Sequence, residues 1–205
     1  MSDLIQLLVA GTALGSVYAL ICLGFVIIYR STGVINFAQG GFVVLGGYLT
    51  HQFAVRSGLP FPMAVALAMA AVAVVGALIE RWVLRRLVGQ PVFATILVTL
   101  GLLFIIEQTC TAIWGYDLRP VGDPWGVGTV PFAGATLKVL DLWTIGAAGL
   151  ILALFFGFFR ATTIGVAMRA AAVDPEAALA HGISPRVIHA LAWAIAGAVA
   201  VVAGV

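Results

Sequence analysis

Six long stretches of the chain contain no Asp, Glu, Lys or Arg, and they constrain the fold more than any other feature. Each has about 18 residues or more, enough for an α-helix to cross a hydrocarbon core of about 30 Å. Hydrophobic residues make up 63% of the chain, more than a soluble domain of 205 residues can bury. We therefore expect an all-α membrane protein, a polytopic helical bundle with about six spans, at residues 4–29, 31–55, 57–79, 87–106, 142–159 and 187–205.

The basic residues predict how these spans are oriented. If the spans alternate in direction, Arg56, Arg119 and Lys138 lie on one side, and the other seven Lys and Arg residues share the opposite side. Because basic residues concentrate on the cytoplasmic side, we expect the N-terminus to lie outside. The net charge of +2 is too small to indicate nucleic acid. The seven basic residues that we expect on the cytoplasmic side are Arg30, Arg81, Arg85, Arg86, Arg160, Arg169 and Arg186.

The second stretch has two amides near its start, in the sequence GVINFAQGGFVVLGGYL at residues 33–49. Asn36 and Gln39 have the spacing of a capping pair, in which Asn accepts from the N–H three residues on and Gln reaches back. A span from Asn36 to about Phe53 is short for a bilayer, so its start should lie within the protein. Gly40 and Gly41 would let backbones approach there. The positive helix end would then face either substrate or a neighbouring helix.

Glu107 is an acid inside the predicted span from about Val92 to Trp114. A charged side chain in that position costs about 3 kcal/mol or more unless it is neutralised or faces the bundle interior. One hypothesis is that its carboxylate meets the ammonium group of a substrate. The other is that hydrogen bonds within the protein make it a link between helices. The candidate substrate pathway therefore comprises Asn36, Gln39, Gly40, Gly41 and Glu107.

The loop at about 160–189 predicts a short helix outside the membrane. Asp174 can cap this helix, Pro175 suits its first position and Glu176 suits the positive end of its dipole. Gly182 can take the left-handed conformation that ends it. Because an isolated helix of about two turns is unstable, it must pack either on its own bundle or on a cytoplasmic partner.

Three blocks of sequence resemble a known family. The EAA of Glu176, Ala177 and Ala178, followed by Gly182, resembles the coupling loop of ABC importer permeases. The wider stretch 162–184 resembles more narrowly the permeases of branched-chain amino acid importers, the LivH type. The stretch 33–49 does so too, as does 99–108 with the following Trp114 and Gly115.

The resemblance implies a permease subunit that moves branched-chain or related amino acids across the bacterial inner membrane by alternating access. Its implied partners are ATP-binding subunits, a second permease subunit of the LivM type, a periplasmic binding protein and membrane lipid. The chain lacks a G-x-x-x-x-G-K-[ST] phosphate loop, so ATP hydrolysis is expected on a partner, and the chain itself is expected to be no enzyme. We expect no cofactor or metal. The residues that would couple to the ATPase are Arg169, Asp174, Glu176, Ala177, Ala178 and Gly182.

A second class of membrane protein also fits the polar residues in the spans. A secondary transporter or channel for a small polar solute, such as urea or an amide, would also have an intramembrane acid and a Gly-rich span. Permeases of the resembled family are longer, with about eight spans, so we expect residues 1–205 to be one transmembrane domain that is C-terminally incomplete.

The outer loop 115–138 should be extracellular, and His51 and Gln52 should lie near the membrane interface. The GxxxG of Gly11 and Gly15 should pack helices closely.

Overall fold

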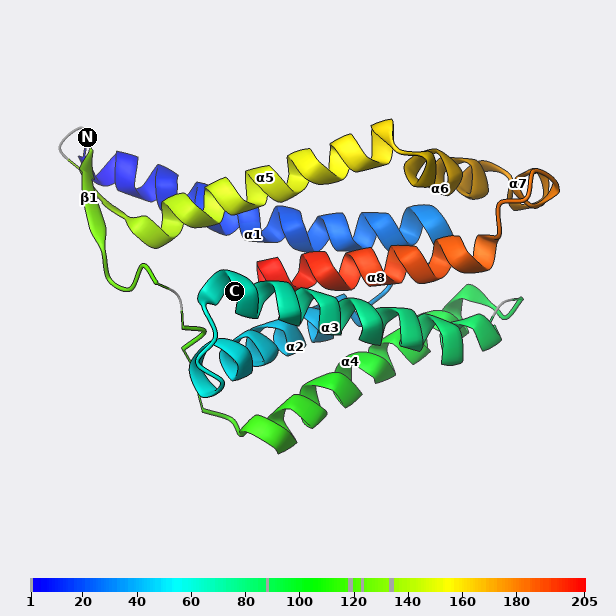
Figure 1. The fold of residues 1–205 in the computed structure, drawn as a ribbon, viewed down its shortest axis with the longest axis horizontal. Helices are drawn as coiled ribbons and strands as arrows, with labels where there is room; N and C mark the ends of the chain where they lie inside the picture. Colours follow the sequence, from blue (N-terminus) through cyan, green and yellow to red (C-terminus); the bar gives the residue numbers. More distant parts are fainter. Residues whose placement is uncertain (1, 88, 118–119, 123, 133–134) are drawn as a thin grey trace.

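The computed structural model describes residues 2–87, 89–117, 120–122, 124–132 and 135–205, and Figure 1 shows its long helices running side by side along the longest axis. A small antiparallel hairpin lies at the end where the N-terminus is found. Within these residues the elements are α1 (Ser2–Thr32), α2 (Gln39–His51), η1 (Gln52–Arg56), α3 (Phe61–Trp82), η2 (Leu84–Leu87), α4 (Val92–Trp114), β1 (Thr129–Phe132), β2 (Ala135–Lys138), α5 (Val139–Ala161), α6 (Thr163–Val173), α7 (Pro175–Ala180) and α8 (Pro185–Ala203).

Among the described residues, five helices are long and apolar enough to cross a membrane: α1, α3 together with η2, α4, α5 and α8. The predicted second span is shorter. It consists of the thirteen residues of α2 and the five of η1, which is a π-helix. The predicted all-α architecture is confirmed, with the hairpin of β1 and β2 as an addition inside the outer loop.

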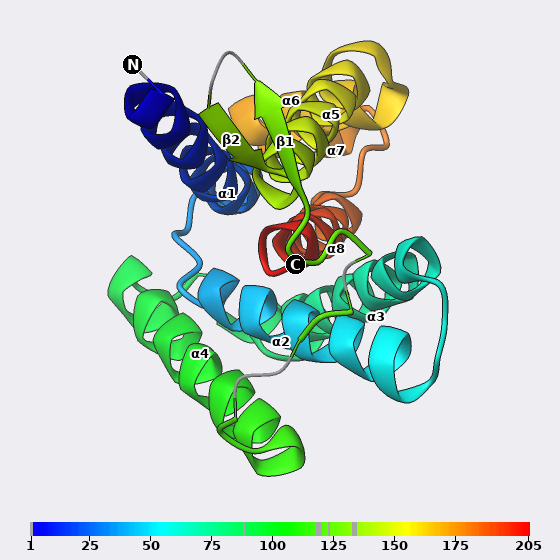
Figure 2. The same ribbon diagram turned by 90° about the vertical axis from the view of Figure 1, so that its left-hand side faces the viewer.

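The last helix, α8, lies at the centre of the bundle. In Figure 2 it runs between a layer of α1 and α5 and a layer of α2 and α3, with α4 outermost. Glycines allow this packing, because a Cβ on Gly76 of α3 would lie 2.6 Å from the carbonyl oxygen of Trp193 in α8. Likewise, a Cβ on Gly46 of α2 would lie 2.7 Å from the Cα of Val201. Trp193 and Phe42, both buried, meet edge to face in the resulting core, with ring centroids 6.1 Å apart.

Among the described residues of this chain, no other helix packs closely against Gly11 and Gly15. Both residues are exposed on α1, and a Cβ added at either would meet no described atom within 4 Å. The residues of α1 that join the core cluster lie further along this helix. They include Leu20 and Ile27, which are buried.

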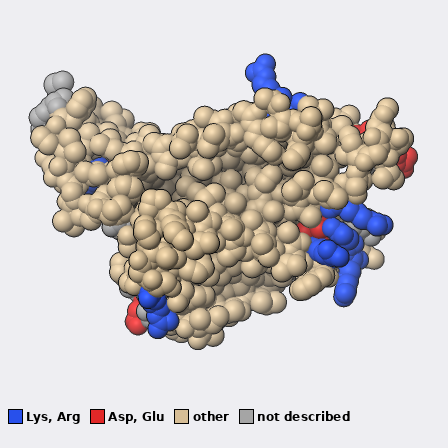
Figure 3. Space-filling view, in the orientation of Figure 1, with Lys and Arg blue, Asp and Glu red and all other residues tan. Residues whose placement is uncertain are grey.

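The basic residues gather at one end of the bundle, where Figure 3 shows most of the blue atoms. Arg30, Arg81 and Arg160 lie in the last turns of α1, α3 and α5. The 3₁₀ turn η2 carries Arg85 and Arg86, while α6 and the first turn of α8 lie at the same end (Figure 1). The seven arginines predicted to share a side therefore do so. On the opposite side, Arg56 ends η1 and Lys138 ends β2, while Arg119 lies outside the described residues.

The opposite end is closed by polar contacts between α2, α4 and the outer loop. His51 is buried and donates from Nδ1 to the carbonyl oxygen of Pro120 at 2.7 Å. The indole N–H of Trp114 donates to Oε1 of Gln52 at 3.1 Å. His51 and Gln52 lie at the outer end of the predicted second span, where they hold the outer loop against α2 and the end of α4 against η1.

Candidate functional site

The chain leaves helical geometry between α1 and α2 and turns inward there. Gly33, with φ at +70°, follows α1, and α2 begins six residues later at Gln39. The backbone N–H of Phe37 donates to the hydroxyl of Thr99 in α4 at 3.3 Å. Asn36 and Gln39 are both 0% exposed. As predicted, the start of α2 lies inside the protein.

The predicted capping pair is wrong in detail. Asn36 accepts through Oδ1 from the N–H of Ala38, two residues on, at 3.0 Å. The N-cap of α2 is Ala38, which has helical dihedral angles and no side-chain cap. The side chain of Gln39 does not reach back. Instead its Nε2 donates to the carbonyl oxygen of Ala196 in α8 at 3.3 Å.

Two buried polar atoms at this break have no hydrogen-bond partner among the described residues: Nδ2 of Asn36, a donor, and Oε1 of Gln39, an acceptor. Buried polar atoms are nearly always paired, so each exception asks for an explanation. Space for the Gln39 amide is provided by Gly24 of α1, where a Cβ would overlap it. Helices α1, α2 and α8 therefore meet around one amide side chain.

The other candidates on the pathway lie along the contact between α2 and α4. A Cβ on Gly40 would lie 3.4 Å from Leu103, and one on Gly41 would lie 3.1 Å from Ile106. Glu107 follows Ile106 and is half-buried. Its carbonyl oxygen accepts from the Thr111 hydroxyl at 2.8 Å, while its carboxylate has no hydrogen-bond partner in the described parts of the chain. The structure therefore places Gly40 and Gly41 on a helix contact, Asn36 and Gln39 at the break beside it, and Glu107 on α4 next to Ile106 of that contact.

The short helix α7 forms as the sequence predicts. Oδ1 of Asp174 accepts from the N–H groups of Glu176 and Ala177 at 3.0 and 2.9 Å. At the other end, Gly182 has φ at +80°, and its N–H donates to the carbonyl of Leu179. The next N–H, of Ile183, donates to the carbonyl of Ala178, which completes a Schellman motif.

One face of α7 packs on its own chain and the rest is exposed. Ala178 is 4% exposed and contributes to the core cluster. Leu179 is 61% exposed, and Glu176 and Ala177 are exposed as well. The predicted loop at 160–189 is mostly helical, since it contains α6 and α7 as well as the start of α8.

Arg169, expected to contact an ATPase, is engaged within the chain. It lies on α6, and its Nη1 donates to the carbonyl oxygen of Phe159 near the end of α5. Its guanidinium also lies over the Phe159 ring, 5.3 Å from the centroid. The side chain therefore braces α6 against α5.

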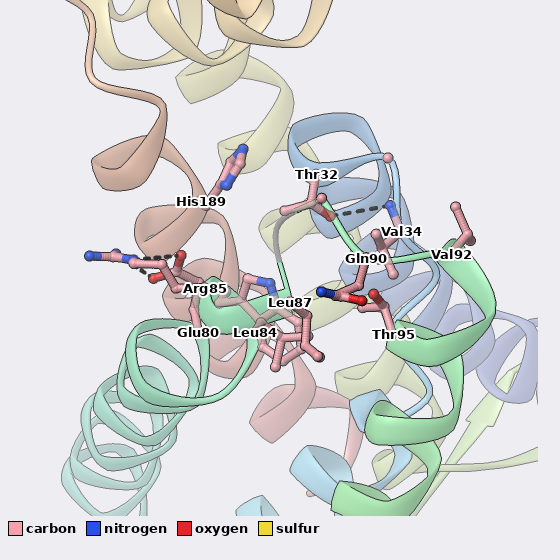
Figure 4. Close-up of a pocket in the computed structure, with 13 residues that line it drawn as sticks. Thr32, Val34, Glu80, Leu84, Arg85, Leu87, Gln90, Val92, Thr95 and His189 are labelled. Atoms are coloured by element: carbon pink, nitrogen blue, oxygen red, sulfur yellow. Dashed lines mark hydrogen bonds and ion pairs between the residues drawn. The ribbon is translucent and has the colours of Figure 1, made fainter.

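A second polar cluster, at the basic end, was not singled out in the sequence. Glu80 in the last turn of α3 and Arg85 in η2 form an ion pair, with Nη2 and Oε2 2.6 Å apart. Figure 4 shows this pair beside His189 on the rim of a cavity of about 290 Å³. The available signal was Glu80 itself, an acid directly beside a group of arginines.

Comparison with known proteins shows which family this sequence matches. Residues 7–205 match the family described as "Branched-chain amino acid transport system / permease component". The high-affinity branched-chain amino acid transport system permease protein LivH of Salmonella typhimurium is 27% identical over 98% of this chain, which covers 69% of LivH. The permease protein BraD of Pseudomonas aeruginosa gives the same values. The probable permease LivH of Methanocaldococcus jannaschii is 26% identical over 90% of this chain and 60% of its own length. No solved structure matches the chain.

Proposed function

This chain belongs to the family of branched-chain amino acid transport permeases, and from that premise we propose that it is the membrane subunit of an ABC importer for branched-chain or related amino acids. Relatives named as permeases of high-affinity branched-chain amino acid transport support this substrate class. The energy for transport comes from ATP that is hydrolysed on partner subunits.

The observation that carries the proposal is α7, a short helix with a cap at each end at the basic end of the bundle. A secondary transporter or channel has no need of a rigid, partly exposed helix outside its spans. In the proposed importer, α7 inserts into the ATP-binding subunit and carries its movement to the bundle. Glu176, Ala177 and Leu179 supply the exposed face, while Asp174, Ala178 and Gly182 fix the helix shape and its seat. Arg169 acts indirectly, because its guanidinium holds α6 in place.

The position of α7 at the basic end also indicates how the bundle is oriented in the membrane. The basic end carries α7 and faces the cytoplasm, as the excess of arginine favours. The N-terminus and the hairpin then lie outside, where a periplasmic binding protein delivers the amino acid. A second permease subunit completes the pathway.

The candidate pathway includes the break before α2. In this proposal Nδ2 of Asn36 and Oε1 of Gln39 are the polar atoms that meet the amino acid, or water moving with it, during alternating access. A buried donor and acceptor left unpaired in one conformation are suited to groups that bind in another. Gly40, Gly41 and Glu107 form the adjoining wall, and the Glu107 carboxylate can meet an ammonium group.

The test is co-purification of the permease with its ATP-binding subunits. Glu176→Lys reverses the charge on the exposed face of α7, so we expect recovery of the ATPase to fall while the permease remains folded. Asp3→Lys, which reverses the charge of another exposed acid at the opposite end, is the matched control and should leave recovery unchanged. Equal recovery with the Glu176 variant would refute the contact through α7.

A further inference from the structure

The cluster around Glu80 and Arg85 joins two parts of the chain that are far apart in sequence. The Glu80 carboxylate accepts two hydrogen bonds from Arg85, from Nη2 at 2.6 Å and from Nε at 3.3 Å. The same Nη2 donates to the backbone carbonyl oxygen of Arg186 at 3.2 Å. Arg85 therefore bridges the end of α3 and the first turn of α8, and we call these three groups the clasp.

Of the three groups of the clasp, the Glu80 carboxylate is shielded from solvent, Arg85 is partly exposed and Arg186 is exposed. The Glu80 side chain is 4% exposed and that of Arg85 is 31% exposed. A buried ion pair adds little stability compared with apolar side chains of similar size, whereas removing one partner is strongly destabilising. Stability alone is thus a weak reason for placing a charged pair here.

The first turn of α8 is also connected to the end of α7 by only a few residues. Two residues, Ile183 and Ser184, separate Gly182 from Pro185 at the start of α8. The hydrogen bond from Ile183 to Ala178 makes this connection part of the C-terminal cap of α7. A displacement of α7 therefore reaches Arg186 through a short, hydrogen-bonded connection.

On its other side, the clasp faces the break before α2. Leu84, Arg85 and Leu87 of η2 line the cavity of about 290 Å³, and Thr32, Gly33 and Val34 of the connection between α1 and α2 line it too. In Figure 4 Arg85 lies on one side of the group of lining residues, and Thr32 and Val34 lie on the other. The same connection leads within two residues from Val34 to the buried Asn36.

We propose that Arg85 is a positioning residue that transmits movement of α7 and the start of α8 to η2, and through the cavity wall to the break that holds Asn36 and Gln39. This inference rests on the proposed function. The Arg fork is suited to the task because it holds a carboxylate in two places and still reaches a carbonyl. When α7 moves, η2 follows, and the cavity beside the break changes shape.

The test uses the full complex of permease, ATP-binding subunits and binding protein in proteoliposomes. The key variant replaces both partners, Glu80→Met with Arg85→Met, so that no unpaired charge remains buried. We expect this complex to assemble and to hydrolyse ATP within about twofold of the wild-type rate, while leucine transported per ATP falls about tenfold. Arg86→Met, which removes an exposed arginine of the same turn, should leave that ratio unchanged.

Each other outcome is decisive. A double variant that transports as many leucine molecules per ATP as wild type overturns the inference, as does an equal fall with Arg86→Met. If the double variant does not assemble, Arg85→Lys decides, since lysine keeps the charge but lacks the fork. A reduced ratio then supports the inference, and either a normal ratio or failure to assemble overturns it. If the wild-type complex shows no ATP-driven uptake, the proposed function fails, and the inference falls with it.

Discussion

Gln39 donates from Nε2 to the carbonyl oxygen of Ala196, 3.3 Å away, and so ties the first residue of α2 to the middle of α8. The bond depends on Gly24, because any side chain there would occupy the space of the Gln39 amide. Three helices are therefore set relative to one another by one amide and one missing side chain. In the proposed importer this is also the point where the pathway passes the break before α2.

Gly24→Ala should displace the Gln39 amide and break its bond to Ala196. The expected loss of stability is about 1–3 kcal/mol, the typical effect of leaving a buried polar group unpaired. Thermal unfolding in detergent measures it. Gly15→Ala, in the same helix but with no described atom within 4 Å of the new Cβ, is the control and should be as stable as wild type or slightly more stable, since alanine improves helix propensity. Equal melting temperatures for the two variants would show that Gly24 has no such role.

Gly76→Ala should push α3 away from α8. Its Cβ would lie 2.6 Å from the carbonyl oxygen of Trp193, and a backbone atom cannot turn aside as a flexible side chain can. Overpacking of this kind destabilises by about 1–3 kcal/mol. In α4, the new Cβ of Gly101→Ala meets no described atom within 4 Å and the substitution improves helix propensity, so stability should be equal or slightly higher. Unfolding in a denaturant series would compare them, and a Gly76 variant as stable as the Gly101 variant contradicts the packing.

Asp174→Ala removes the N-terminal cap of α7. The local helix should lose about 1 kcal/mol, so hydrogen exchange of its amides should accelerate about fivefold while the rest of the bundle is unaffected. Asp174→Asn keeps the accepting Oδ1 and should exchange close to the wild-type rate. Exchange measured by mass spectrometry on peptides covering 175–182 tests this. Unchanged exchange in the alanine variant would mean that packing alone holds α7.

Local signals in the sequence predicted α7 correctly. Its cap, its first proline and its terminal glycine all act within a few residues, so Asp174 and Gly182 could be assigned without knowing the rest of the fold. The long apolar helices were predictable for a similar reason, because their length and composition are properties of each segment.

Contacts between distant segments were harder to predict. The spacing of Asn36 and Gln39 suggested a mutual cap, but the carbonyl of Ala196 and the gap at Gly24 offered Gln39 a partner on another helix. The clasp was missed because Glu80 and Arg85 are five residues apart, which is not the spacing of a helical pair. They meet because the chain leaves α3 and forms the tighter 3₁₀ turn η2.

ATP-dependent uptake of leucine is the most direct test of the proposed importer. The full-length permease, reconstituted with its ATP-binding subunits and binding protein, should accumulate labelled leucine only when ATP is inside the compartment that holds those subunits. Accumulation should persist after ion gradients are dissipated, since ATP is the energy source. Uptake that follows an ion gradient without ATP, or no leucine uptake at all, would contradict the account.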